Sequence, residues 1–402
     1  MKVNEISEIE QLLPKEIIER DILSSLITDF KKKEIQVLYG PRQVGKSVLL
    51  YLLMKKAFTC GAEVFYYNLD AMEEEFTSPQ IFINEITSKK RTDGNVYIFI
   101  DEIQRKRDIG LFLKYIYDKN LNFKFIVTGS ASLNIKNIIN EPLTGRKFEY
   151  FLPPLSLFEQ AKHKGIETAK LTLSTPSFLE VLENNLLYGG YPQVFLYKTR
   201  EEKVHKLLEI SRSYITRDLT DLFKIENSKE LENTAVFLAH NIGNILSKEN
   251  LGKVMSLTYT KVNSYLDALE KSFVICLVKP YFKDPIKEIS HRSKVYFWDN
   301  GIRNILLYKS ELGKLTLEKG RLFEQVVFQL LKSQVEKIKY WRNINQTEVD
   351  FVMEKGEKIE VYEAKYSFEK TGVPRNLSSF KEKYQKIIEK MEIISKENIF
   401  RF

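Results

Sequence analysis

The stretch "GPRQVGKS", residues 40–47, combines two glycines, a lysine and a serine in the spacing of a phosphate-binding loop. It fits the pattern G-x-x-x-x-G-K-[ST], with an apolar run before it and a helical pattern after it. Backbone N–H groups of such a loop surround phosphates, and glycine allows an approach that a Cβ would block. We expect Lys46 to reach the β- and γ-phosphates of ATP and Ser47 to ligate Mg²⁺. The residues expected to line the nucleotide are Gly40, Pro41, Arg42, Gln43, Val44, Gly45, Lys46, Ser47 and Val48.

A loop of this kind that hydrolyses ATP needs a second, acidic position, and the stretch "VYIFIDE", residues 96–102, provides one. Asp101 ends an apolar strand pattern and is expected to hold Mg²⁺, directly or through water. Glu102 follows it, where a carboxylate can orient and deprotonate the attacking water. The alternative is an acidic surface pair that only ends a strand.

Polar residues that follow the fourth apolar run are further candidates for contact with phosphate. Thr128 and Ser130 end the run at residues 123–130, and we favour Thr128 as the group near the γ-phosphate. The alternative for either residue is the N-cap of the segment that follows. Arg146 comes after a glycine in a loop, from which an arginine finger can reach a neighbouring subunit's phosphates. The alternative is a structural or surface arginine.

Near the end of the chain, "EVDFV" and "EVYEAK" place a second set of carboxylates on two strands. Asp350 lies in the first strand, and Glu363 and Lys365 share one face of the next because side chains alternate. Two carboxylates at one sheet edge can share a divalent metal beside a lysine, and Glu324 on the preceding helix is a further candidate ligand. The set resembles the PD-(D/E)xK nuclease pattern, except that Val349 replaces the usual proline. The alternative is a scaffold whose charged residues pair with one another.

The elements that position these groups follow from the hydrophobic pattern. The first part of the chain alternates helical patterns with almost continuously apolar runs, which predicts an α/β fold with a parallel sheet buried on both faces. These runs lie at residues 35–40, 62–70, 96–102 and 123–130. Strand patterns return later, together with a helix at residues 320–334, and predict a second α/β region. The later strands are expected at residues 294–299, 348–354 and 358–367.

The region between the two sheets is mostly helical. Residues 230–246, 247–257 and 258–273 read as three helices, and "VICLVKPYF" reads as a strand that Pro280 ends. Three short helices before a hairpin are the order of a winged helix. The third helix is expected to expose DNA-contacting residues near its start, namely Thr258, Thr260, Lys261, Asn263 and Ser264. The alternative is a winged helix that packs against protein, because lysine and arginine are not dense here.

Residues 17–160 look like the AAA-type domain of a family of archaeal and bacterial ATPases, on "YGPRQVGKSVLL", "YIFIDEIQ", "FIVTGSASL" and "LTGRKFEYFLPPLSLFE". The later part is similar to the domain of unknown function 4143, on "YGGYPQVF", "YFWDNGIRNIL", "GRLFEQVVF", "EVDFV" and "EVYEAKYS". The resemblance implies an AAA+ P-loop ATPase domain at residues 1–170. It further implies a helical, winged-helix domain at residues 171–289 and an α/β, PD-(D/E)xK nuclease-like domain at residues 290–402.

The composition narrows the classes of protein that fit. Lys and Arg number 62 and Asp and Glu 54, so the net charge is +8, which is compatible with a nucleic-acid partner. Two cysteines far apart exclude a disulfide framework and a cysteine-based metal cluster. The chain shows neither a signal-peptide core nor an apolar window of ~20 residues, which predicts a cytoplasmic protein without a membrane partner.

These observations predict an Mg²⁺-dependent AAA+ ATPase that forms a homo-oligomer and couples ATP binding or hydrolysis to DNA. Two alternatives stay open. One is an ATP-gated switch of the defence-scaffold type, in which the later regions bind protein. The other is a metal-dependent DNA nuclease that ATP licenses.

Overall fold

The computed structural model divides the chain into two compact units. Unit 1 comprises Met1–Pro153 with Lys271–Phe273, and unit 2 comprises Pro154–Glu270 with Val274–Phe402. The described residues are 2–70, 76, 78–91, 94–106, 108–130, 142–171, 174–282, 284, 286, 288, 291–308, 318–335, 337–368 and 374–402, without the side chains of 216 and 217.

Unit 1 is built on a six-stranded sheet in the order β1-β3-β4-β5-β2-β6. Its short first strand is antiparallel to β3, and the other neighbours are parallel. The strands are β1 (Lys2–Val3), β2 (Ile35–Tyr39), β3 (Glu63–Asn68), β4 (Val96–Asp101), β5 (Phe123–Gly129) and β6 (Lys147–Phe151). Four of them lie where the apolar runs predict, so the parallel α/β fold is confirmed. Because these strands are parallel, their carboxyl ends meet at one edge of the sheet.

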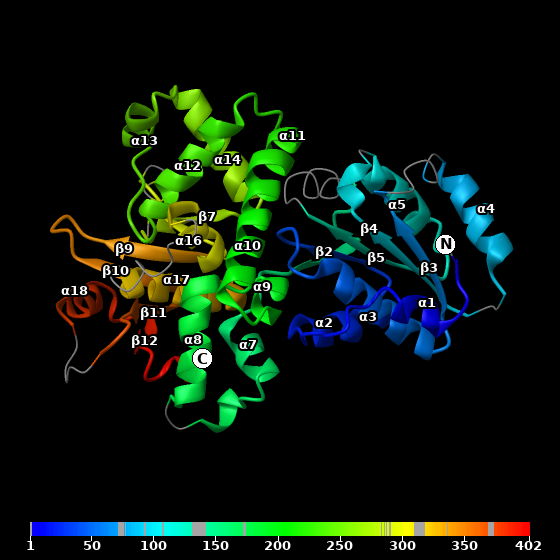
Figure 1. The fold of residues 1–402 in the computed structure, drawn as a ribbon, viewed down its shortest axis with the longest axis horizontal. Coiled ribbons are helices and arrows are strands. Elements are labelled where there is room, and N and C mark those ends of the chain that lie inside the picture. Colours follow the sequence, from blue (N-terminus) through cyan, green and yellow to red (C-terminus); the bar gives the residue numbers. More distant parts are fainter. Residues whose placement is uncertain are drawn as a thin grey trace. The chain divides into compact units, whose positions relative to one another are not determined.

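Helices cover both faces of this sheet (Figure 1). One face carries α1 (Ile6–Glu10), α2 (Ile22–Thr28) and α3 (Lys46–Thr59), and the other carries α4 (Pro79–Lys89) and α5 (Ile109–Asp118). Apolar side chains of α4 and α5 form one core with alternate residues of the strands. The intervening strand residues face α3, which buries Leu49, Leu50, Leu53, Met54 and Ala57. Burial on both faces explains why these strands are almost continuously apolar.

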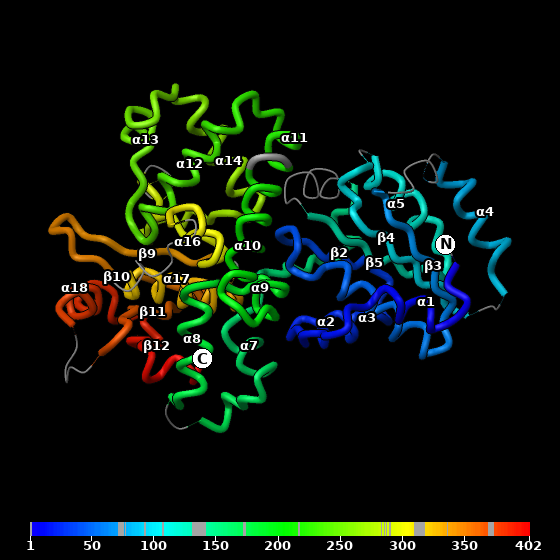
Figure 2. The backbone as a smooth tube through the Cα atoms, in the orientation of Figure 1, coloured from blue at the N-terminus to red at the C-terminus, as the bar shows by residue number. Residues whose placement is uncertain are grey.

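Unit 2 contains a second six-stranded sheet in the order β12-β11-β10-β9-β7-β8, which Figure 2 traces toward the C-terminus. The pairs β7–β9 and β11–β12 are parallel, and the other neighbours are antiparallel. The strands are β7 (Ile275–Pro280), β8 (Lys294–Phe297), β9 (Ile338–Arg342), β10 (Glu348–Lys355), β11 (Lys358–Ala364) and β12 (Ile388–Ile394). The predicted strands correspond to β7, β8, β10 and β11, whereas β9 and β12 were not predicted.

The helices of unit 2 precede and interrupt this sheet. They include α7 (Leu157–His163), α8 (Pro176–Tyr188), α9 (Pro192–Leu196), α10 (Arg200–Ser211), α11 (Leu219–Phe223), α12 (Ser228–His240), α13 (Lys248–Met255), α14 (Tyr259–Lys271), α16 (Asn300–Tyr308), α17 (Lys319–Gln334) and α18 (Arg375–Tyr384). A π-helical stretch, η5 (Arg212–Asp218), joins α10 to α11. The helices α12, α13 and α14 and the hairpin of β7 and β8 follow one another in the predicted winged-helix order.

The first helix of that set is shorter than predicted. We expected it to run to residue 246, but α12 ends at His240. Gly243 adopts φ +71, a left-handed conformation that a continuing α-helix does not contain. Ile242 and Ile245 instead form β-bridges to β8. The prediction was wrong here because a local apolar pattern cannot distinguish a last helical turn from an extended segment that pairs with a distant strand.

The boundaries at residues 170/171 and 289/290 stay predictions. The parallel pairing of β7 with β9 places strands from the last two predicted domains in one sheet. Within the described ranges, no helix is both long enough and apolar enough to cross a membrane.

Candidate functional site

The phosphate-binding loop lies between the carboxyl end of β2 and the first turn of α3. Gly45 is the N-cap of α3 and adopts φ 97, and Gln43 adopts φ 60. Ser47 is therefore in the first turn of α3, where the positive end of the helix dipole favours an anion. The Lys46 ammonium is buried and donates to the carbonyls of Gly40, at 3.1 Å, and Pro41, at 2.7 Å. The lysine thus lies folded back along its own loop.

Two contacts hold this loop in position. A Cβ on Gly40 would lie 2.1 Å from the carbonyl oxygen of Leu152, just after β6, so no larger residue fits there. The buried Arg20 guanidinium donates to the carbonyl of Val44 at 2.9 Å and to that of Pro153 at 2.7 Å. Sequence reasoning missed Arg20, because nothing in the residues around it marks it as a loop contact.

Asp101 and Thr128 lie side by side at the carboxyl ends of β4 and β5. The Thr128 hydroxyl donates to Asp101 Oδ1, and both side chains are buried. The same Oδ1 accepts the backbone N–H of Glu102 at 3.1 Å. The structure therefore brings Thr128 to the predicted magnesium ligand, whereas Ser130 contacts the next carboxylate.

Glu102 is held in a small polar ring. Its Oε2 accepts from the side-chain amide of Gln104 and from the Ser130 hydroxyl, the latter at 3.3 Å. Gln104 also donates to Ser130 Oγ at 2.9 Å. Glu102 adopts φ 58, an uncommon conformation for a residue other than glycine. Gln104 was not predicted to have a role, although it lies two residues after the expected base.

The charged groups at the carboxyl ends of these strands can bind a polyanion together with a cation. Burial lowers the pKa of Lys46 to about 8, and Arg42 adds to this, while Glu102 and Asp101 oppose it. Added phosphate would restore a strong preference for the charged ammonium. A carboxylate, a hydroxyl and a lysine at the end of a glycine loop are the donor set that a nucleotide with Mg²⁺ requires, so the residues fit that group.

Arg146 lies at the other end of the strands of this sheet, next to the amino ends of β2 and β6. Its carbonyl accepts the N–H of Ile35 at 2.9 Å, and Lys147 pairs with Ile35 at the start of β2. The phosphate-binding loop follows the end of β2, which is roughly 17 Å away for five strand residues. The guanidinium pairs instead with Asp118 at 2.9 Å. Arg146 is therefore too distant to touch a phosphate bound in its own loop.

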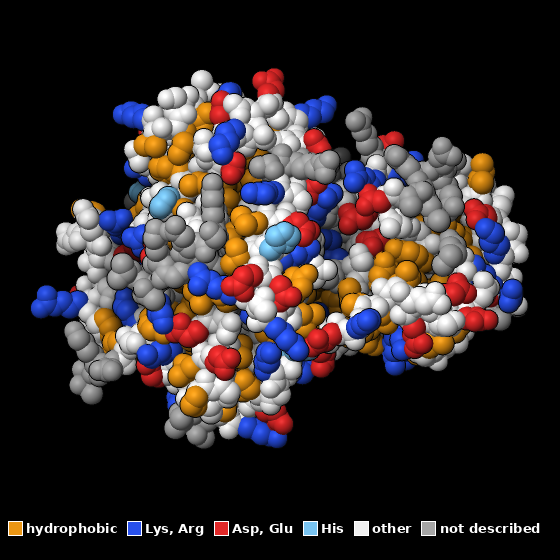
Figure 3. Space-filling view, in the orientation of Figure 1, with side chains coloured by type: hydrophobic (Ala, Val, Ile, Leu, Met, Phe, Trp, Pro, Cys, Tyr) orange, Lys and Arg blue, Asp and Glu red, His pale blue; other side chains and the backbone are white. Residues whose placement is uncertain are grey.

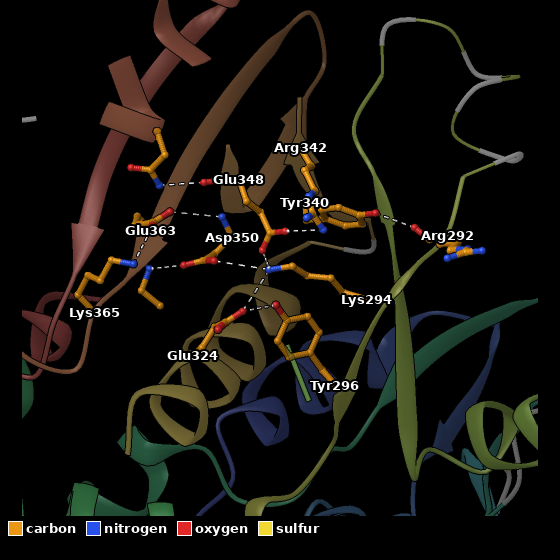
Figure 4. Close-up of polar contacts among 12 residues, drawn as sticks. Arg292, Lys294, Tyr296, Glu324, Tyr340, Arg342, Glu348, Asp350, Glu363 and Lys365 are labelled. Atoms are coloured by element: carbon orange, nitrogen blue, oxygen red, sulfur yellow. Dashed lines mark hydrogen bonds and ion pairs between the residues drawn. The ribbon is translucent and has the colours of Figure 1, made fainter. Parts of the chain in front are cut away.

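A second charged site lies in unit 2, where the structure brings together the carboxylates predicted at its C-terminal strands (Figure 4). The N–H of Ala364 donates to Asp350 Oδ2 at 3.0 Å, and the N–H of Asp350 approaches Glu363 Oε2 at 3.4 Å. Lys365 pairs with Glu363 at 2.7 Å. Burial and the neighbouring Asp350 raise the pKa of Glu363.

Lys294, which the sequence did not single out, occupies the centre of this site. Its side chain is 1% exposed, and its Nζ lies 2.6 Å from Glu348, 3.4 Å from Glu324 and 3.6 Å from Asp350. Burial alone lowers the pKa of Lys294, but Tyr296 and the three carboxylates raise it well above its ordinary value. Burial and Asp350 raise the pKa of Glu324 to about 7. We call Lys294, Glu324, Glu348, Asp350, Glu363 and Lys365 the carboxylate cluster.

The predicted metal ligands of the carboxylate cluster do not form a metal site as they stand. Over the part of the chain that the structure describes, no three histidine, cysteine, aspartate or glutamate side chains are arranged to hold a metal ion. The oxygen atoms of Glu324, Glu348 and Asp350 are directed at an ammonium group instead.

Comparison with protein families assigns the first region. Residues 32–161 match the family model of an AAA domain. This range is therefore similar to AAA domains. The β2–loop–α3 geometry and the acidic end of β4 lie within it, and this part of the protein has a P-loop ATPase fold. Residues 179–313 match a domain of unknown function (DUF8612) and residues 319–402 another (DUF4143). The latter match confirms the predicted C-terminal relationship over a shorter range.

Two similar proteins match most of this chain. A protein of Methanocaldococcus jannaschii described as uncharacterized is 27% identical over 390 residues, which are 94% of this chain and 83% of that protein. An uncharacterized protein of Haemophilus influenzae is 22% identical and covers 94% of each chain. A Walker-type ATPase of Pyrococcus abyssi resembles the fold with a TM-score of 0.48, at 16% identity, over 73% of this chain and 97% of that one.

Proposed function

We propose that the protein is an Mg²⁺-dependent ATPase whose catalytic residues surround the loop at residues 40–47. The observation that carries this proposal is the convergence of Lys46, Asp101 and Glu102 at one edge of a parallel sheet beside the AAA-type loop. The loop N–H groups and the start of α3 bind the phosphates, and Lys46 turns from its loop carbonyls to the β- and γ-phosphates. Ser47 and Asp101 would hold Mg²⁺, which would supply positive charge to the phosphates.

The same geometry supports Glu102 as the group that accepts the proton. A carboxylate one residue past the magnesium ligand can accept a proton from water held near the γ-phosphate. Gln104 and Ser130 hold that carboxylate through Oε2, so Glu102 can accept the proton from water at Oε1. Thr128 contacts Asp101 and positions the ligand rather than the water.

Steady-state ATP turnover and nucleotide binding test this assignment together. Glu102→Gln should lower turnover by about 10²–10⁴-fold, since only the base is lost, and leave the Kd for ATP almost unchanged. Lys46→Ala should instead weaken binding. Turnover of Glu102→Gln at the wild-type rate would show that another group activates the water.

The position of Arg146 supports a homo-oligomer. Because Arg146 lies at the edge of the sheet away from its own loop, it can act as an arginine finger only on the nucleotide of a neighbouring subunit. Its partner Asp118 is half exposed, so the ion pair can open when a stronger anion is presented.

We further propose that unit 2 couples ATP to DNA through α14. Thr258, Thr260, Lys261 and Ser264 are exposed near the start of that helix, whereas Asn263 is half-buried. The Thr258 hydroxyl caps the helix by accepting from the N–H of Lys261 at 3.3 Å. An exposed, polar N-terminal turn on the third of three helices is the arrangement that a winged helix presents to DNA.

One observation favours the alternative of an ATP-gated, protein-binding switch. The Lys261 ammonium already pairs with Glu230 at 2.9 Å, so it is not free for a phosphate. On the face drawn in Figure 3, basic and acidic side chains are interspersed over unit 2, and no large area of one charge stands out.

Fluorescence anisotropy with duplex and single-stranded DNA, with and without ATP, separates the two functions. DNA binding should weaken as salt rises, and Lys261→Gln should reduce the salt slope by about one. Lys229→Gln is the matched control, because that exposed lysine pairs with Glu232 on α12. Absence of DNA affinity at low salt would leave the protein-binding switch as the function of unit 2.

A further inference from the structure

The carboxylate cluster carries an inference about the C-terminal sheet that is independent of the ATPase. Figure 4 shows side chains from β8, β10 and α17 directed at one point, and the group at that point is the Lys294 ammonium. One oxygen each of Glu348, Glu324 and Asp350 lies 2.6–3.6 Å from Nζ. Three carboxylates, two from β10 and one from α17, therefore share one buried cation.

A divalent ion would need the same oxygens. Mg²⁺ takes oxygen ligands at about 2.0–2.1 Å and usually keeps several waters. The space between these oxygens is filled by Nζ, whose side chain is 1% exposed. We propose that Lys294 is the resident cation of the carboxylate cluster and takes the place of a divalent metal ion. The cluster of this nuclease-like sheet therefore binds no divalent ion.

Several contacts keep Lys294 from leaving. Its backbone pairs with Val278 of β7 on one side and bridges to Ile245 on the other. Its ammonium lies 5.6 Å from the centre of the Tyr340 ring, on which a cation is stabilised. Strand pairing fixes the backbone of Lys294, and burial with three ion pairs holds its ammonium in place.

The carboxylates are fixed as firmly as the lysine. The Tyr296 hydroxyl donates to Glu324 Oε1 at 2.5 Å. A Cβ on Gly243 would lie 3.1 Å from both oxygens of Glu324, so the loop after α12 covers that carboxylate closely. Glu363, the remaining predicted ligand, is already paired with Lys365. Lys294 and Lys365 thus pair with the carboxylates that an ATP-licensed nuclease would use to bind its metal.

The test is a titration of the nucleotide-free, full-length protein with Mn²⁺, in which electron paramagnetic resonance measures the free ion. Wild type and Asp350→Asn should bind the same amount of Mn²⁺, because any ion near Asp101 is common to both. Lys294→Met should bind one Mn²⁺ ion more than wild type does. The Kd for this ion should be at least tenfold lower than that of any Mn²⁺ site in unit 2 of the wild type. The double variant Lys294→Met/Asp350→Asn should lose that ion.

Lys339→Met is the matched control, because Lys339 on β9 is also largely buried and bridges two glutamates, Glu288 and Glu354. It should gain no Asp350-dependent ion. Circular dichroism follows folding, and a Lys294→Met protein that folds only with Mn²⁺ also supports the proposal. Mn²⁺ binding by the wild type that Asp350→Asn abolishes would overturn it, as would a folded Lys294→Met protein without the further ion. The comparison of wild type with Asp350→Asn decides the matter if Lys294→Met does not fold under any condition.

Discussion

At the scale of single residues, the nucleotide site depends on the charge of one buried ammonium. Lys46 has a pKa of about 8 because burial opposes its charge, so the free protein holds it partly neutral above that pH. Bound phosphates favour the ammonium and raise this pKa. Binding above pH 8 must therefore take up a proton, whereas binding below pH 8 does not.

The ionisation of Lys46 should consequently leave the Kd for ATP independent of pH below pH 8. Above pH 8 it should raise this Kd by up to about tenfold per pH unit. Isothermal titration between neutral and alkaline pH measures this, and heats in buffers of different ionisation enthalpy report the proton uptake. Lys46→Arg is the control, since its guanidinium does not titrate in this range. A wild-type profile that stays flat to pH 9.5 would contradict the argument.

Arg20 acts on the same loop from outside it. The guanidinium joins the carbonyls of Val44 and Pro153, and hydrogen bonds from a charged group contribute about 1.5–3 kcal/mol. Arg20→Met should raise the Kd for ATP about tenfold, because the loop loses one of its two fixed contacts. Arg20→Lys should have a partial effect, since the guanidinium donates to the two carbonyls from two different nitrogens and an ammonium has only one. Equal Kd values for all three proteins would show that Gly40 and Leu152 position the loop alone.

At the scale of elements, local pattern predicted the strands that carry the nucleotide site. β2, β4 and β5 are almost continuously apolar, and the loop and the acids that follow them are recognisable from residue type and spacing. β9 and β12 escaped because they mix charged and apolar residues, as in "IEKMEII", and gain their strand structure from pairing. The position of Lys294 could not be predicted either, because its carboxylate partners lie 30–56 residues away in sequence and only the folded sheet brings them together.

Asp299 shows how two motifs that the sequence analysis noted become one structural element. The carboxylate accepts from the N–H of Gly190 at 2.7 Å and from that of Ile302 at 2.9 Å, so it joins the turn after α8 to the start of α16. Burial raises its pKa to about 6. A Cβ on Gly189 would lie 2.3 Å from the same carboxylate, which explains the glycine pair in "YGGYPQVF".

Asp299→Ala should lower the free energy of unfolding of unit 2 by about 2–5 kcal/mol, because two buried N–H groups lose their acceptor. Asn227→Ala, which removes the N-cap of α12 at the surface, should cost only about 1 kcal/mol. Urea unfolding followed by tryptophan fluorescence reports unit 2 alone, because Trp298 and Trp341 are both in it. A loss for Asp299→Ala no larger than that for Asn227→Ala would assign the carboxylate to surface capping.

At the scale of the whole molecule, the two units keep separate charged sites. Unit 1 holds the proposed ATP-binding groups, and the carboxylate cluster of unit 2 contains its own cations, Lys294 and Lys365. The proposed nucleotide site of a single chain lacks the predicted arginine finger. Among the described residues, Arg146 lies at the amino end of β6 and not at the carboxyl ends of the strands, where the phosphate-binding loop is. Hydrolysis is therefore expected to depend on assembly.

Arg146→Ala should reduce turnover by ~10³–10⁵-fold and leave the Kd for ATP unchanged, since the finger acts in the transition state of a neighbour's reaction. Arg146→Lys should recover little, because a point charge does not replace the planar fork. Lys55→Ala is the control for loss of a surface ion pair in unit 1, and its turnover should match wild type. Mixing Arg146→Ala with Lys46→Ala should restore activity, because roughly a quarter of randomly formed interfaces then combine an intact loop with an intact finger. Turnover by Arg146→Ala at the wild-type rate, or a wild-type specific activity that does not change with concentration in a protein that stays monomeric with ATP, would place the full catalytic set within one chain.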